Sequence, residues 1–135
     1  MNEADLITLL KGNPDFTKVT EASLGALISS GEIQELDGGV EIIREKEAGQ
    51  RIWVLIEGEL EILVNGTLVN RITSPGEVVG QISAVSLTPA TATVRMAKAG
   101  KCLAISHRAL HEVMKSSPQL AESILRSMAK YLERR

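Results

Sequence analysis

The chain has 135 residues, of which 44% are hydrophobic and 24% are charged, so its length and composition are those of a single globular domain. Its net charge of −2 and its scarcity of aromatic residues argue against a general nucleic-acid binder. The longest wholly apolar run, residues 52–56, is far shorter than the roughly 20 residues that cross a membrane. Because the N-terminus lacks an export signal and Cys102 is the single cysteine, we expect a cytoplasmic protein without membrane contact.

The N-terminal segment predicts helices. A short apolar stripe over residues 6–10 is followed by a helix breaker at residues 12–14. Thr20 is placed to cap a second helix, in which Leu24 and neighbouring apolar residues recur at helical spacing. Gly31 stands where this second helix is expected to end.

From about residue 33 the pattern changes to short strands. The Asn65 and Gly66 pair joins two alternating segments, which is the strongest local signal for a β-hairpin. Gly100 separates the last two strand-like segments. Short strands at this spacing are typical of a sandwich or small barrel. The segments that read as strands are 40–43, 51–57, 60–64, 68–72, 91–97 and 102–105.

The C-terminal residues return to helical spacing. Ser106 is placed to cap one helix, and Ser117, which precedes a proline, to cap a second. We therefore predict an α+β fold with N-terminal helices, an antiparallel β-roll of the jelly-roll-like, double-stranded β-helix type over about residues 33–106, and two trailing helices over about 107–134. No linker interrupts the pattern, so we expect one domain over residues 1–135.

The last predicted helix carries an apolar stripe that has to be buried somewhere. Its members are Leu120, Ile124, Leu125, Met128 and Leu132. The stripe could pack back on the roll or pair with a second copy of the chain, and the two outcomes are not exclusive. The second outcome predicts a homodimer whose contact includes this helix.

Residues 49–58 combine an opening glycine, a hydrophobic strand with Trp53 near its centre, and a closing glycine. Further on, Gly76 follows a proline, and residues 80–94 read Gly-Gln-Ile-Ser-Ala-Val-Ser-Leu-Thr-Pro-Ala-Thr-Ala-Thr-Val. These patterns resemble the cyclic nucleotide-binding domain family, which includes cAMP receptor protein and the regulatory subunits of protein kinase A, and residues 80–94 match its phosphate-binding cassette without a gap. The resemblance covers about residues 16–132 and implies a regulatory or ligand-sensing β-roll.

The resemblance also implies candidate ligand residues and two departures. In the family, a cassette glutamate accepts a hydrogen bond from the ribose 2′-hydroxyl and a cassette arginine pairs with the cyclic phosphate. Here these positions are Gln81 and Ala90. Loss of one partner from a buried charge pair costs about 2–5 kcal/mol, so we expect cAMP or cGMP binding to be weak or lost, with a weak site for another small anion at the amides near Gln81. The candidate residues are Gly80, Gln81, Ile82, Ser83, Ala90, Thr91 and Ala92.

Three other groups of residues are weaker candidates. Arg95 and Lys98 could supply a replacement cation, but strand alternation directs Arg95 towards solvent. His107 and His111 have a spacing that can hold a metal, yet no third ligand accompanies them, so we expect a solvated helix face. Cys102 is expected to be a small core residue.

Nothing in the sequence pairs a nucleophile with a base, so we predict a non-enzymatic module. Two functions stay open. Retention of Gly80 and Gln81 favours a ligand sensor, whereas Ala90 favours a dimerisation or protein-interaction module that needs no ligand.

Overall fold

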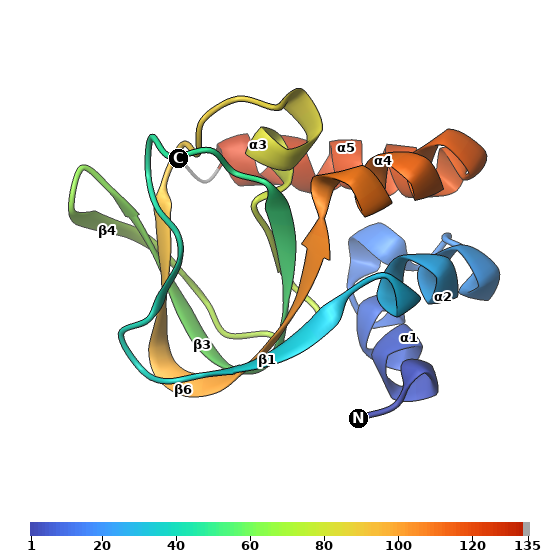
Figure 1. Ribbon diagram of the computed structural model, residues 1–135, viewed down its shortest axis with the longest axis horizontal. Coiled ribbons are helices and arrows are strands. Elements are labelled where there is room, and N and C mark those ends of the chain that lie inside the picture. Colours follow the sequence, from blue (N-terminus) through green and yellow to red (C-terminus); the bar gives the residue numbers. More distant parts are fainter. Residues whose placement is uncertain (134–135) are drawn as a thin grey trace.

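The computed structural model describes the backbone of residues 1–133 and the side chains of residues 1–130, and it has the predicted α+β architecture (Figure 1). Its helices are α1 (Glu3–Lys11), the 3-10 helix η1 (Pro14–Phe16), α2 (Glu21–Ser29), α3 (Gln81–Ser86), α4 (His107–Ser116) and α5 (Pro118–Glu133). Its strands are β1 (Glu32–Leu36), β2 (Glu41–Ile43), β3 (Arg51–Val64), β4 (Thr67–Ile72), β5 (Val78–Val79) and β6 (Thr93–Ser106). No helix within residues 1–133 is long and apolar enough to cross a membrane.

The strands form an antiparallel roll, as predicted. β1, β6, β3 and β4 lie side by side in that order, β2 pairs with β6, and β5 pairs with β3. In Figure 1 the strands curl round on themselves, and α1, α2, α4 and α5 gather on one side of the curl. α3 is inserted between β5 and β6 and contacts β3, α4 and α5, so this short helix lies where the roll meets the helices.

Two strands are longer than the sequence analysis predicted. Breaks were expected at Gly58 and Gly100, but β3 and β6 each continue for 14 residues through these glycines. Gly58 has a φ of +103°, and a Cβ there would lie 3.1 Å from the carbonyl oxygens of Lys98 and Ala99. A Cβ on Gly100 would fall directly on the Glu57 carbonyl, and the pairing register shifts around this point. The facing glycines therefore let two paired strands bend without separating.

The predicted β3–β4 hairpin is confirmed. Asn65 and Gly66 have φ values of 52° and 78°, which is the left-handed conformation that a two-residue type I′ turn requires at both positions. Val64 and Thr67 pair on either side of the turn. The Asn65 N–H also donates to Glu45 Oε1 at 2.9 Å, and this bond links the hairpin to the β2–β3 loop.

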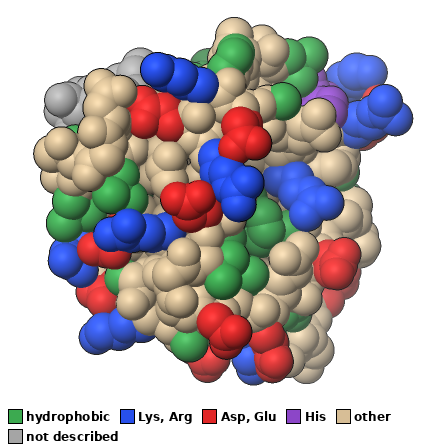
Figure 2. All heavy atoms as spheres, turned by 60° about the vertical axis from the view of Figure 1, so that its left-hand side comes forward, with side chains coloured by type: hydrophobic (Ala, Val, Ile, Leu, Met, Phe, Trp, Pro, Cys, Tyr) green, Lys and Arg blue, Asp and Glu red, His purple; other side chains and the backbone are tan. Residues whose placement is uncertain are grey.

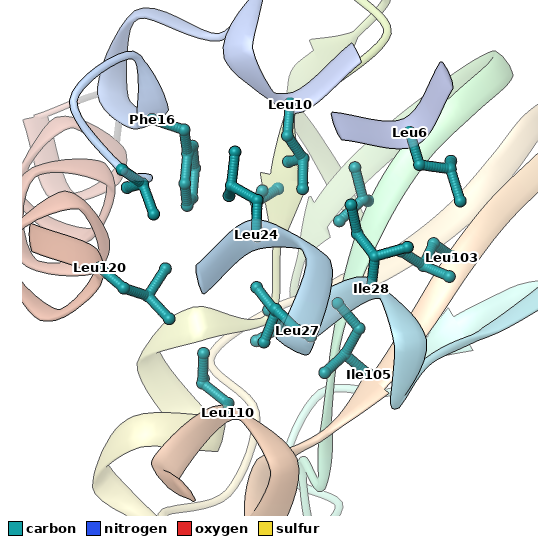
Figure 3. Close-up of a cluster of buried hydrophobic side chains, with 14 of the residues drawn as sticks. Leu6, Leu10, Phe16, Leu24, Leu27, Ile28, Leu103, Ile105, Leu110 and Leu120 are labelled. Atoms are coloured by element: carbon teal, nitrogen blue, oxygen red, sulfur yellow. The ribbon is translucent and has the colours of Figure 1, made fainter. Parts of the chain in front are cut away.

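β3 separates two hydrophobic cores, and alternation along the strand assigns its side chains to one or the other. Ile52 and Val54 face the helices, whereas Trp53 and Leu55 face the interior of the roll. Because both faces are covered, the segment is apolar without interruption. Figure 3 shows the core between the helices and the sheet. Its labelled members are Leu6, Leu10, Phe16, Leu24, Leu27, Ile28, Leu103, Ile105, Leu110 and Leu120.

Charged side chains on the β4 side of the molecule are mixed in sign. Figure 2 shows basic and acidic side chains interspersed over this face. Among the ion pairs of the sheet, Arg71 and Arg95 both contact Glu61, at 3.2 Å and 3.1 Å. Interspersed charges of this kind do not produce the strong one-signed potential that steers a charged macromolecule towards a surface.

Candidate functional site

The candidate cassette begins where β5 passes into α3. Gly80 caps α3 with a φ of 87°, and a Cβ there would lie 2.8 Å from the Arg51 carbonyl oxygen, so this turn requires glycine. α3 ends at Ser86, and the next residue, Leu87, also has a left-handed φ, 57°, and leaves 65% of its surface exposed. A leucine in this conformation is strained. The two left-handed residues fold the chain back, so that residues 90–92 face the first turn of α3.

The structure brings the predicted ligand residues together around one cavity. Its volume is about 20 Å³, which is enough for about one water molecule. Sites for small organic molecules measure roughly 300–1,000 Å³. The space between these side chains is therefore too small for a nucleotide in this conformation, and two larger hollows, of about 340 Å³ each, lie along residues 48–50. The lining residues of the small cavity are Gly80, Gln81, Ile82, Ser83, Ala90, Thr91 and Ala92, all seven predicted from the sequence, together with Ile43 and Val94.

The β2–β3 loop, residues 44–50, covers the cassette and is hereafter named the strap. The Lys46 N–H donates to the Ala90 carbonyl at 2.9 Å, and the Ala90 N–H donates to the Glu47 carbonyl at 2.9 Å. Both backbone groups of Ala90 are thus engaged by the strap.

The strap also packs closely against the cassette. Ala48 forms an isolated β-bridge with Pro89. Gly49 lies against Ser83, because a Cβ on Gly49 would stand 2.8 Å from the Ser83 Cβ and nearer still to its hydroxyl oxygen. Glycine at position 49 therefore has a packing reason in this chain: the strap approaches α3 too closely for any side chain there.

The cavity has no basic side chain among the described residues that line it. Ala90 is buried at the position that the resemblance assigns to the phosphate-binding cation. Arg95 Nε lies 3.1 Å from Glu61 Oε1, and Lys98 Nζ lies 3.6 Å from Glu59 Oε2. The two cations considered as replacements are therefore paired with glutamates of β3, and Arg95 lies outside the cavity, as alternation predicted.

Gln81 is buried, and its side-chain nitrogen makes two hydrogen bonds within the protein. Its Nε2 donates to the Val78 carbonyl at 3.1 Å and to Ser127 Oγ on α5 at 3.0 Å. A main-chain carbonyl can only accept, so the NH₂ end of the carboxamide is the end that faces Val78. Sequence analysis missed this link between the cassette and the last helix.

The buried face of α5 contains polar residues as well as apolar ones. Leu120 and Ile124 are fully buried in the helical core, and Ser123 and Ser127 lie buried on the same side of the helix. Two serines at this spacing inside an apolar stripe were the available sequence signal, because a buried hydroxyl needs a hydrogen-bond partner. Here each donates to a carbonyl of its own helix, and Ser127 also accepts from Gln81.

The predicted dimer stripe divides into a buried and an exposed part, which corrects the prediction for two of its members. Leu120 and Ile124 are core residues and are not available for contact between two copies. Leu125 is 60% exposed, and Met128 is half-buried at the edge of the core. The side chain of Leu132 lies outside the described residues.

The two histidines bind backbone carbonyls. His111 Nε2 lies 3.1 Å from the Ala84 carbonyl and joins α4 to α3, so its expected solvated position is corrected, whereas His107 Nδ1 lies 3.2 Å from the Gln50 carbonyl. Within residues 1–133 no cluster of three or more His, Cys, Asp or Glu could hold a metal ion. Cys102 is a core residue, as predicted, and burial raises the pKa of its thiol to about 11.

Comparison with known proteins gives the same fold. The family model described as the cyclic nucleotide-binding domain matches residues 33–117. The chain resembles cAMP-bound PfPKA-R with a TM-score of 0.84 at 14% identity, over 98% of this chain and 45% of that one, so it spans less than half of that structure. It resembles the sensor domain of the transcriptional regulator DNR from Pseudomonas aeruginosa (TM-score 0.75, 19% identity, 93% and 92% covered). The N-terminal domain of a transcriptional regulator from Streptomyces coelicolor A3(2) is 27% identical (TM-score 0.71, 93% and 92% covered), and no curated protein sequence matches.

Proposed function

Since the chain belongs to the cyclic nucleotide-binding domain family, we propose that it is a non-enzymatic regulatory module whose cassette binds cyclic nucleotide weakly or not at all. One observation carries the proposal: the cavity has Ala90 where a phosphate needs a cation, and none of its described lining residues is basic. The small volume of the cavity supports it.

The energetics favour weak binding. A cyclic phosphate loses its hydration when it enters a pocket, and a bidentate guanidinium is the group that best compensates for that loss. Without the cation the site forgoes about 2–5 kcal/mol. This corresponds to roughly a 30-fold to several thousandfold loss of affinity.

Calorimetric titration of the chain with cAMP, cGMP and inorganic phosphate tests the proposal. We expect no dissociation constant tighter than on the order of 1 μM for any of the three. A nanomolar constant for either nucleotide would contradict weak binding and show that the closed cavity opens at little cost. Inorganic phosphate separates a residual anion site from recognition of the whole nucleotide.

A second candidate function, dimerisation without a ligand, is favoured by the exposed side of α5. Ala121, Leu125, Met128 and Leu132 follow one another at intervals of four, three and four residues, which is the spacing of the contact positions in a two-stranded coiled coil. A second copy laid along this side of α5 would cover the exposed surface of Leu125. The partner in this proposal is therefore another molecule of the same chain.

Sedimentation of point variants tests this dimer. Truncation at Ser117 would remove Leu120 and Ile124 from the core and is unsuitable. Leu125→Glu places a charge on the proposed contact, and Gln119→Glu places the same charge on an exposed position elsewhere around α5. We expect a dimer for the wild type and Gln119→Glu and a monomer for Leu125→Glu. A monomeric wild type at high micromolar concentration would refute the dimer.

The buried cysteine, the net charge and the buried polar groups bear on where the protein works and what it binds. Cys102 is a buried free thiol, which is consistent with the reducing cytoplasm. The net charge of −2 is consistent with a module that does not bind nucleic acid by itself. Among the described residues every fully buried side-chain nitrogen and oxygen has a hydrogen-bond partner, so these groups support structure.

A further inference from the structure

One of the two hollows along the strap is lined by charged and polar side chains, and it is hereafter named the strap hollow. Its volume of about 340 Å³ lies at the lower end of the range for small-molecule sites. Among the described lining residues it shares only Ile43 with the cassette cavity. The strap hollow is therefore a separate place in the fold with room for a small molecule. Its charged and polar lining includes Glu41, Arg44, Glu47, Arg51 and Trp53.

The indole of Trp53 brings an unused hydrogen-bond donor to this hollow. The side chain is 6% exposed and belongs to the core of the roll, yet its Nε1–H makes no hydrogen bond with the described residues. Every fully buried side-chain nitrogen in the described part of the chain has a partner, so this N–H has to reach accessible surface. Because Trp53 lines the strap hollow, we place the N–H at the surface of that hollow. A nearly buried donor in this position suits recognition of a ligand oxygen.

Arg51 adds a positive charge that no described carboxylate neutralises. It stands two residues before Trp53 on β3, so the two side chains lie on one face of the strand, about 7 Å apart along it. Arg51 is exposed and makes no ion pair within the described residues. Arg44 differs, since its Nε lies 3.1 Å from Glu41 Oε1 and 3.9 Å from Glu47 Oε2. The strap hollow thus holds one unpaired guanidinium beside one that is already paired.

The balance of charge in the strap hollow favours a singly charged ligand. Its two arginines and two glutamates cancel, and both glutamates lie against Arg44. A carboxylate matches the one unpaired guanidinium, whereas the second negative charge of a phosphate would face two nearby glutamates. We propose that the strap hollow binds a small organic carboxylate, which pairs with Arg51 and accepts a hydrogen bond from the Trp53 N–H. The site goes beyond the proposed function, because it uses none of the candidate cassette residues.

The single tryptophan of the chain lets this site be observed directly. A proton–nitrogen correlation spectrum of the full-length protein contains one indole N–H signal, which is followed during titration with benzoate and with pyruvate. Benzamide is the neutral counterpart of benzoate. We expect benzoate to shift the indole signal with a dissociation constant of roughly 1 mM or tighter, and benzamide to bind at least about tenfold more weakly. An indole signal that neither carboxylate moves at about 10 mM, or equal binding of benzamide, would overturn the proposal.

The chain offers a matched pair of cations for a mutational test. Arg51 and Lys46 are both exposed, neither makes an ion pair within the described residues, and only Arg51 lines the strap hollow. Arg51→Gln should weaken benzoate binding at least about tenfold, and Lys46→Gln should stay within about twofold of the wild type. Equal weakening in the two variants would show that overall charge attracts the ligand, which would refute the site.

Two further arms separate the donor from the cation and the carboxylate from other anions. Trp53→Phe keeps an aromatic ring but loses the N–H, so calorimetric titration should show about fivefold weaker benzoate binding. Urea unfolding checks that this core variant is folded, and Arg51→Gln, at an exposed position, carries the test if it is not. Unchanged benzoate binding by folded Trp53→Phe would refute the role of the N–H. Inorganic phosphate that binds more tightly than benzoate would refute the choice of a carboxylate.

Discussion

Replacing Ala90 with arginine restores the cation that the cassette lacks, and the structure indicates both the gain and the cost. A buried guanidinium–phosphate pair contributes about 2–5 kcal/mol. The cavity of about 20 Å³ cannot hold an arginine, so the side chains that line it have to move apart. Overpacking of this kind costs about 1–3 kcal/mol. The midpoints leave about 1.5 kcal/mol in favour of binding, so Ala90→Arg should bind cAMP roughly tenfold more tightly than the wild type.

The control for this experiment is Ala90→Met, which adds comparable length without charge. Both variants should be less stable than the wild type to urea without ligand, because both overpack the cavity. Only Ala90→Arg should gain stability when cAMP is added, and calorimetric titration should show the affinity difference directly. Equal cAMP affinity in the two variants would refute the reasoning, since it would mean that the phosphate does not come near residue 90 or that the cavity cannot open.

A second substitution extends this test. Adding Gln81→Glu to Ala90→Arg supplies the charged acceptor of the family cassette and should strengthen cAMP binding further. The carboxylate cannot donate to Val78 or Ser127, so the double variant should also be less stable than Ala90→Arg without ligand. No change in affinity between the single and double variants would show that residue 81 does not reach the ligand.

Three further predictions concern packing and ionisation. Gly49→Ala should lower the free energy of unfolding by about 1–3 kcal/mol, because its Cβ has no room against α3. Gly25→Ala, inside α2 with ordinary contacts, should raise it by about 0.5–1 kcal/mol. Urea titration measures both, and an unchanged stability of Gly49→Ala would mean that the strap moves aside easily. Burial raises the pKa of the Cys102 thiol to about 11, so the folded chain should resist alkylation at pH 8. The stability of the fold should decline from about pH 9 towards pH 11, because the thiol ionises first in the unfolded chain. Rapid alkylation of the folded chain would contradict the burial of Cys102. Asn13→Ala removes the donor to the buried Gly76 carbonyl and should cost about 1–3 kcal/mol by thermal unfolding, and a smaller loss would indicate that water replaces the amide.

Local signals predicted local structure well. The Asn65 and Gly66 pair predicted the hairpin because the φ values of a type I′ turn depend on two adjacent residues alone. Gly58 and Gly100 were misinterpreted as strand ends because their role depends on each other. They meet across two paired strands, and no pattern within either strand reveals the partner.

The candidate site shows the same limit. The seven residues of the candidate cassette line one cavity, but their role in binding stays a prediction, and the absence of a cation at Ala90 was visible in the sequence. The strap and the link from Gln81 to Ser127 were not predicted, because both join segments distant along the chain. Helical periodicity likewise identified the apolar side chains of α5. It could not separate the buried Ile124 from the exposed Leu125, because that difference depends on where the neighbouring helices pack.

The pairing of β3 with β6 has a consequence for how quickly the protein folds. The two strands pair in a nested order, from Leu63 opposite Thr93 outward to Arg51 opposite Ser106. The inner pair closes the shorter loop, so it carries the smaller entropic penalty, and each later pair adds little to it. The β3–β4 hairpin shortens that loop further. Substitutions at the hairpin turn should therefore slow refolding, whereas substitutions in α5, which packs against η1, α3 and α4, should mainly accelerate unfolding.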